Sequence, residues 1–122
     1  MLNKKLNEAW TMLEQGVSNF NDPFHWPILG TRGNQGCHQR TVILRQLKIP
    51  ERILICYTDA RAPKTQQISL CDKVSWLFYH PEKKIQLRIA GRAQLHTDDM
   101  LADELWSKTS ITTRLNFCAI DP

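Results

Sequence analysis

The chain has 122 residues, of which 42% are hydrophobic, and this is enough for one domain, residues 1–122, with a single apolar core. Its formal charge is +4 and its sequence pI is about 9.0, with the basic residues spread along the chain. This excludes a basic tail, but a mild excess of positive charge suits a phosphorylated small ligand and a weak nucleic-acid contact equally well.

Cysteine spacing and the N-terminal residues indicate the compartment. The four cysteines lie far apart, with no Cys-x-x-Cys pair, so free thiols in a reducing compartment are expected. The first eight residues are too polar for a signal peptide, and no apolar run reaches membrane-spanning length. We therefore expect a cytoplasmic protein without membrane contact.

The first predicted element is an amphipathic helix over about residues 2–16. A break at 21–23 ends this part of the chain. A short first strand is expected over 24–31, and a turn at 32–36 leads into a second strand that reaches about Arg45. The helix is predicted from apolar residues that recur at helical spacing, namely Leu2, Leu6, Trp10, Leu13 and Val17.

The middle of the chain predicts three more strands and one short helix. The apolar run 53–57 is typical of a buried strand, and residues 65–71 favour a short helix. A further strand is expected over 74–79. Residues 84–95 alternate between apolar and polar side chains, which is typical of a strand with one face on the core.

The last part of the chain predicts helices over about residues 97–117, beginning with Thr97 as N-cap and including a second helical piece over 112–117. The order is therefore a helix, about five strands within 24–95, and C-terminal helices. Short turns rather than helical crossovers join the strands, so the sheet should be mostly antiparallel. The predicted fold class is mostly β with flanking helices, in a small barrel that closes on itself.

Four basic residues on two neighbouring segments are the strongest functional signal. A β-type run carries Arg40 and Arg45 at its ends, and the loop after the next strand carries Arg61 and Lys64. Guanidinium and ammonium groups are the usual partners of phosphate oxygens, so a phosphorylated ligand is predicted. Arg40 and Arg45 are five residues apart, so their side chains should point to opposite faces. Alternatively, all four are solvated charges at strand ends and in a surface turn.

Gln86 lies in mid-strand among apolar neighbours, where its amide offers a ligand both a donor and an acceptor. The alternative is a solvent-facing residue on the polar side of the strand. No His or Cys spacing matches a zinc site, and no metal is expected. Neither a Gly-x-Ser-x-Gly motif nor a Gly-rich phosphate loop occurs, so no catalytic residue is assigned.

The order of these segments resembles the pyridoxamine 5′-phosphate oxidase-like family, whose members bind FMN on a split β-barrel. The resemblance covers roughly residues 24–120 and depends on the joint order of the segments 40–45, 57–58 and 58–64 and of Gln86. The third segment is similar to the Thr-Asp-x-Arg-Ser-x-Lys loop of the Alr4036-type branch, with Ala in place of Ser.

The resemblance implies a homodimer that holds FMN at its interface and uses the flavin for hydride or electron transfer. Residues 40–45 would line the flavin, Arg61 and Lys64 would bind its phosphate, and Gln86 would contact its ring or ribityl chain. The implied FMN contacts are Arg40, Thr41, Val42, Ile43, Leu44, Arg45, Tyr57, Thr58, Arg61, Lys64 and Gln86.

Two departures from the family bear on substrate and length. The family's oxidases hold the substrate phosphate with a Tyr, an Arg and a Ser, where this chain has Glu104, Lys108 and Thr112. Arg45 also replaces the substrate-binding Lys, so oxidation of pyridoxamine phosphate is not expected. Family members continue beyond the point where this chain ends, and the chain is therefore expected to be truncated at its C-terminus, with an incomplete barrel.

The leading hypothesis is an FMN-dependent oxidoreductase with an unknown small-molecule substrate. One alternative is a flavin-binding or dimerisation module without turnover. The other is a small basic β-barrel that binds nucleic acid, for which steep salt dependence of binding would be evidence.

Overall fold

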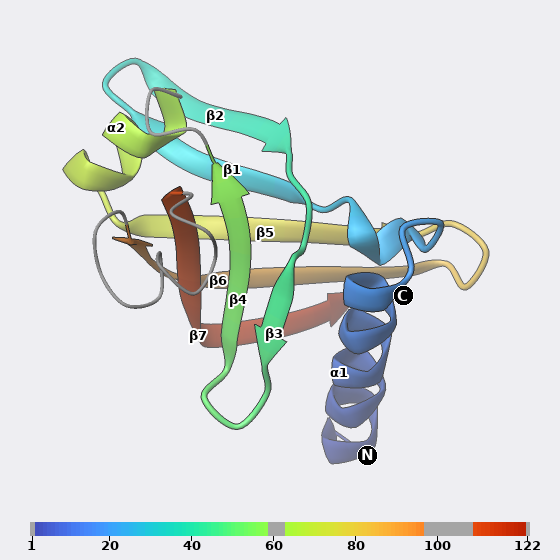
Figure 1. Cartoon of the computed structure of the whole chain (residues 1–122). Coiled ribbons are helices and arrows are strands. Elements are labelled where there is room, and N and C mark those ends of the chain that lie inside the picture. Colours follow the sequence, from blue (N-terminus) through green and yellow to red (C-terminus); the bar gives the residue numbers. More distant parts are fainter. Residues whose placement is uncertain (1, 59–62, 97–108, 122) are drawn as a thin grey trace.

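The chain folds around one curved sheet of seven strands with a long helix packed on it (Figure 1). This computed structural model describes residues 2–58, 63–96 and 109–121. The helical elements are α1 (Leu2–Ser18), the 3₁₀ turn η1 (Pro23–His25) and α2 (Pro63–Leu70). The strands are β1 (Ile28–Gly33), β2 (Gly36–Thr41), β3 (Gln46–Lys48), β4 (Ile53–Thr58), β5 (Lys73–His80), β6 (Ile85–His96) and β7 (Thr109–Asp121).

All neighbouring strands pair antiparallel, in the order β2-β1-β5-β6-β7-β4-β3. Short turns join β1 to β2 and β5 to β6, as strands of alternating direction allow. The register between β6 and β7 shifts at Ala90/Gly91, and an irregularity of this kind bends a sheet. Figure 1 shows the resulting bend along β7.

One continuous segment borders both edges of the sheet. β2 forms one edge and β3 the other, yet only residues 42–45 separate them in the chain. The amide of Leu44 donates to the carbonyl of His25, just before β1, at 3.1 Å. The next amide, of Arg45, donates to the carbonyl of Ile55 on β4, at 2.9 Å. The segment therefore passes from one edge to the other without β2 pairing with β3. This confirms a split antiparallel barrel. The expectation that the barrel closes on itself is wrong, because residues 42–45 cross between the two edges and no pair among the described strands joins them.

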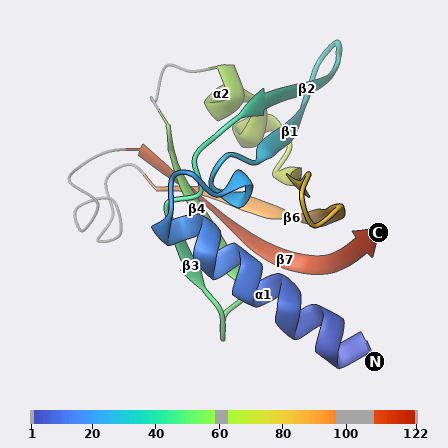
Figure 2. The same ribbon diagram turned by 90° about the vertical axis from the view of Figure 1, so that its right-hand side faces the viewer.

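The core lies between the inner face of the sheet and α1, which runs beside β3 (Figure 2). Alternate residues of β5 and β6 are buried, as the alternation in the sequence predicts. The rings of Trp76 and Phe78 stack with centroids 6.1 Å apart, and Phe24 packs on Phe78 at 5.2 Å. Other buried core residues are Leu13, Leu29, Leu44, Leu54, Leu87 and Ile89.

A tight corner joins α1 to β1. Gly16 lies near the end of α1, where a Cβ would come within 2.7 Å of the Phe24 backbone. The carbonyl of Gly16 accepts a hydrogen bond from His25 Nδ1 at 2.6 Å. Asp22 caps η1, because its carboxylate accepts a hydrogen bond from the Phe24 amide at 2.8 Å. Contacts that are local in the sequence therefore hold the helix against the start of the first strand.

The prediction for the C-terminal part of the chain is wrong where the structure describes it. Residues 112–117 are not a helix, because they belong to β7 and pair with β6 and β4. The run 111–113 consists of Ile and two Thr, and such β-branched residues favour strands. The helix predicted from Thr97 lies outside the described residues.

Other elements match the prediction with shifted boundaries. The expected helices over 2–16 and 65–71 are α1 and α2. The first strand begins at Ile28, because the chain turns through η1 before it. The second ends at Thr41, because the following residues change pairing partner from β1 to β4. With β3 and β7 added, the sheet has seven strands rather than about five.

Gly16→Ala is expected to destabilise the protein, although Ala favours helices over Gly by about 1 kcal/mol. The added methyl group would meet the Phe24 backbone, and overpacking of this kind costs about 1–3 kcal/mol. Urea unfolding should show a net loss of stability. Gln15→Ala, an exposed position beside it, is the control and should stay within about 0.5 kcal/mol of wild type. Equal stability of the two variants would contradict the predicted clash, because it would show that the Phe24 backbone can move away from the added methyl group at no cost.

Candidate functional site

Arg40 reaches from β2 toward β1 and α2 at one end of the barrel. Its Nη1 donates to the carbonyl of Leu29 at 3.0 Å and to Thr31 Oγ1 at 2.8 Å, and its Nη2 donates to Gln67 Oε1 at 3.2 Å. Partial burial lowers the pKa of Arg40, and nearby Cys56 partly offsets this. An arginine nevertheless stays protonated in a protein. All three acceptors are uncharged, so they hold the guanidinium without neutralising it.

Arg40 and Lys64 both act electrostatically on the thiol of Cys56. The Cys56 side chain is fully buried in the core on β4, and burial raises the pKa of its thiol to about 12. The charges of Lys64 and Arg40 both lower that pKa, so both cations lie within electrostatic range of the sulfur. Lys64 is half-buried in the first turn of α2. We call Arg40 and Lys64 the inner cation pair.

The run that begins at Arg40 alternates between the two faces of the barrel wall, as the sequence predicts. Its even-numbered residues face inward, where Val42 and Leu44 are buried in the core. Its odd-numbered residues are half-buried or exposed. Among them, Arg45 lies over the Tyr57 ring, with 5.4 Å between the guanidinium carbon and the ring centroid. Arg40 therefore lies on the inner face of the barrel wall and Arg45 on the outer face.

The remaining predicted contacts are spread more widely. Thr58 is the last residue of β4 and is in register with Thr109. Arg61 lies outside the described residues. Gln86 is half-buried at the start of β6, opposite Tyr79.

The sheet register separates Gln86 from Arg40 within one copy of the chain. Arg40 is opposite Leu29, Leu29 is opposite Trp76, and Trp76 is opposite Ile89. Gln86 is thus three strands across and three residues along, or about 14 Å and about 10 Å at ordinary strand spacings. It also alternates with the core residues of β6, so it faces outward. Within one copy, Gln86 is therefore separated from Arg40 along the sheet and faces outward.

Sequence reasoning missed Thr31, Gln67 and Cys56. Thr31 is buried and Gln67 is half-buried, and both are bonded to Arg40. No motif joins them, because Thr31 and Gln67 are 36 residues apart in the chain. One weak signal was present, since Gln67 follows Lys64 by three residues and such a spacing places both on one side of a helix.

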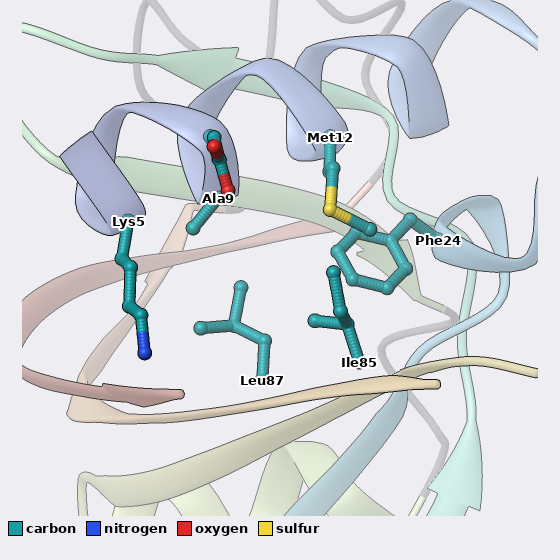
Figure 3. Close-up of a pocket in the computed structure, with 7 residues that line it drawn as sticks. Lys5, Ala9, Met12, Phe24, Ile85 and Leu87 are labelled. Atoms are coloured by element: carbon teal, nitrogen blue, oxygen red, sulfur yellow. The ribbon is translucent and has the colours of Figure 1, made fainter. Parts of the chain in front are cut away.

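An apolar cavity of about 170 Å³ lies elsewhere, between α1 and the start of β6. Figure 3 shows Ala9 and Met12 of α1 above Ile85 and Leu87 of β6, with Lys5 reaching down beside them. None of the predicted FMN contacts lines this cavity. It therefore belongs to the packing of α1 on the barrel and not to the cationic site.

Two other kinds of site are absent from the described part of the chain. Within residues 2–58, 63–96 and 109–121, no group of three or more His, Cys, Asp or Glu side chains is placed to hold a metal ion. In the same ranges, no helix combines the length and the hydropathy that crossing a bilayer requires. The cysteines with described side chains, Cys37, Cys56 and Cys71, are free thiols.

Comparison with known proteins places the chain among flavin-binding domains. A family model described as pyridoxamine 5′-phosphate oxidase, FMN-binding domain, matches residues 7–97, most of the chain. The matched residues include Arg40, Arg45, Lys64 and Gln86. No protein with a curated description matches the sequence.

Solved structures share the fold at low sequence identity. A candidate pyridoxamine 5′-phosphate oxidase from Listeria innocua is 18% identical with a TM-score of 0.75, over 93% of this chain and 95% of that one. A Clostridium acetobutylicum protein related to general stress protein 26, of the pyridoxinephosphate oxidase family, is 14% identical with a TM-score of 0.78, over 97% and 88%. A pyridoxamine 5′-phosphate oxidase-related, FMN-binding protein from Nostoc punctiforme is 24% identical with a TM-score of 0.65, over 81% and 51%.

Cys56 is expected to resist alkylation in the folded protein, whereas Cys37 reacts. The thiolate is the nucleophile, and burial both excludes the reagent and keeps the Cys56 thiol protonated, with its pKa at about 12. Cys37 is exposed. Iodoacetamide labelling at about pH 8, read by peptide mass spectrometry, should modify Cys56 at least about tenfold more slowly. Unfolding in guanidinium should equalise the rates, and equal rates before unfolding would contradict the burial of β4.

Proposed function

The chain belongs to the family of pyridoxamine 5′-phosphate oxidase FMN-binding domains, and from this premise we propose that it is an FMN-dependent oxidoreductase of a small-molecule substrate. FMN is the cofactor of this family of domains. The observation that carries the proposal is the inner cation pair, which lies within the matched residues and makes no ion pair with a carboxylate in the described part of the chain.

The inner cation pair fits the phosphate of FMN. Lys64 is half-buried in the first turn of α2, and its ammonium group is a suitable partner for an anionic phosphate. Partial burial strengthens the attraction, because the effective dielectric constant there is lower than in bulk water. We propose Arg61, two residues before the start of α2 in the sequence, as a further phosphate ligand.

The outer face supplies the proposed contacts to the rest of the flavin. Arg45 and Tyr57 already lie against each other there, so both can contact one planar group. A cation held beside the flavin would favour its anionic reduced form. When bound, FMN supplies hydride or electron transfer, while the protein supplies position and electrostatics. The other proposed contacts along these two segments are Thr41, Ile43 and Thr58. Val42 and Leu44 are also proposed contacts, through backbone atoms, because their side chains are buried in the core.

The separation of Gln86 from the inner cation pair supports a homodimer. In one copy, Gln86 lies several strands away from Arg40 and faces outward. This placement favours an FMN that contacts Arg40 and Lys64 of one copy and Gln86 of the other copy of the chain. We therefore propose that FMN is held at an interface between two copies.

Residues at the family's substrate positions favour a substrate other than pyridoxamine 5′-phosphate. Arg45 stands where the family's oxidases have Lys, and Glu104 would repel a substrate phosphate. A substrate without a phosphate group would meet no such repulsion.

The visible absorption spectrum of the purified protein, before and after adding FMN and desalting, tests the proposal. The protein is expected to retain flavin bands, and a reduced nicotinamide or an amine substrate should bleach them because the cofactor is redox-active. A colourless protein that cannot be reloaded would contradict FMN binding. Retained FMN that no donor reduces would instead favour a flavin-binding module without turnover.

Mixed dimers of Lys64→Ala and Gln86→Leu chains test the shared site. Lys64→Ala alone should weaken FMN binding more than about tenfold, given about 1.5–3 kcal/mol for a hydrogen bond to a charged group. Lys48→Ala, which removes an exposed cation on β3, is the control and should bind normally. In the mixed dimer, one site should keep wild-type affinity. That site combines Lys64 of the Gln86→Leu chain with Gln86 of the Lys64→Ala chain. Two impaired sites per mixed dimer would show that both residues act within one copy.

A further inference from the structure

We infer that Gln67 is a positioning residue for Lys64, acting through a buried polar triad that it forms with Thr31 and Arg40. The inference rests on the proposed function, because it concerns how the protein holds the phosphate of FMN. It adds two residues, Thr31 and Gln67, that lie outside the predicted set of contacts.

The polar triad ties three elements together at one end of the barrel. Arg40 on β2 donates to Thr31 on β1 at 2.8 Å and to Gln67 on α2 at 3.2 Å. The Thr31 hydroxyl also donates to Gln67 Oε1, so this amide oxygen accepts two hydrogen bonds. Thr31 is only 3% exposed, and the other two residues are half-buried. Each member is therefore bonded to both of the others.

α2 has few other anchors on the barrel. It is eight residues long, and a helix of this length is not stable alone in water. Among the α2 residues whose burial is described, only Ile68 is buried, while Leu70 is 72% exposed. Gln67 supplies a polar anchor beside Ile68. Because Lys64 lies one turn before Gln67, a displacement of the helix at Gln67 also displaces Lys64.

The charge of the triad explains why an amide suits position 67. A carboxylate there would bond Arg40 more strongly, but it would also cancel the charge of the guanidinium. The neutral Gln67 oxygen holds Arg40 in place and leaves its field available to an anionic ligand. Gln67 thus fixes the position of both members of the inner cation pair and preserves their charge.

FMN titrations of wild type, Gln67→Leu, Lys64→Ala and the double variant test the inference. Gln67→Leu should weaken FMN binding by about fivefold when Lys64 is present and by less than about twofold when it is absent. Most of the effect is expected to pass through Lys64, and only the contact of Gln67 with Arg40 remains in the Lys64→Ala background. Equal losses in both backgrounds would overturn the inference, since Gln67 would then act independently. Gln39→Leu, an exposed position on β2, is the matched control and should leave the affinity unchanged.

Hydrogen exchange of the FMN-free protein gives a readout that does not depend on the flavin. Amides of α2 should exchange faster in Gln67→Leu, while those of β5 and β6 should not change. Unchanged exchange in α2 would overturn the inference. Gln67→Glu keeps the acceptor, so it should retain the protection of α2 and yet bind FMN more weakly than wild type. Wild-type protection together with wild-type affinity in Gln67→Glu would show that charge at this position is irrelevant and would overturn the electrostatic part.

The failure of the inference can be told apart from the failure of the proposed function. A wild-type protein that binds no FMN would refute the proposed function and, with it, the inference. Wild-type binding that is unaffected by Gln67→Leu would refute only the role of Gln67.

Discussion

The structure depends on the passage of residues 42–45 from one edge of the sheet to the other. Hydrogen bonds from this segment reach β4 on one side and the residues before β1 on the other, so both edges are bordered by one continuous chain. Unpaired strand edges are open to association with other chains, and a curled sheet limits them. The same passage forms the barrel wall that separates Arg40 from Arg45. The curl of the sheet and the placement of the two arginines thus depend on the same segment.

The inner cation pair combines partial burial with uncharged partners. Burial of charge is unfavourable unless hydrogen bonds compensate it, and for Arg40 a carbonyl, a hydroxyl and an amide supply them. Because none of these three groups is negative, they leave the positive charge of Arg40 uncancelled. A phosphate would supply the negative charge that these three hydrogen-bond partners lack. If FMN binds here as proposed, the hydrogen bonds that stabilise Arg40 would also support ligand affinity.

The fold tolerates wide sequence change while the pattern of burial stays in place. Relatives with 14% to 24% identity share the architecture at TM-scores of 0.65 to 0.78. An antiparallel barrel requires alternation along its strands and suitable turns rather than particular residues. The cations and the polar triad are different, because their chemistry depends on individual side chains. In the proposed site, function would therefore depend on a few positions on a permissive scaffold.

Local periodicity in the sequence determined α1, β5, β6 and the opposite directions of Arg40 and Arg45, because helical and strand spacings act over a few residues. Residues 112–117 were predicted as a helix, although the β-branched residues at 111–113 favour a strand, and in the structure they pair with β6 and β4 as part of β7. Only the tertiary structure decided that Thr31, Arg40 and Gln67 meet and that Gln86 does not join them. Both facts follow from which strands are neighbours in the sheet, and strand order brings together residues that are distant in the chain without leaving a local signal.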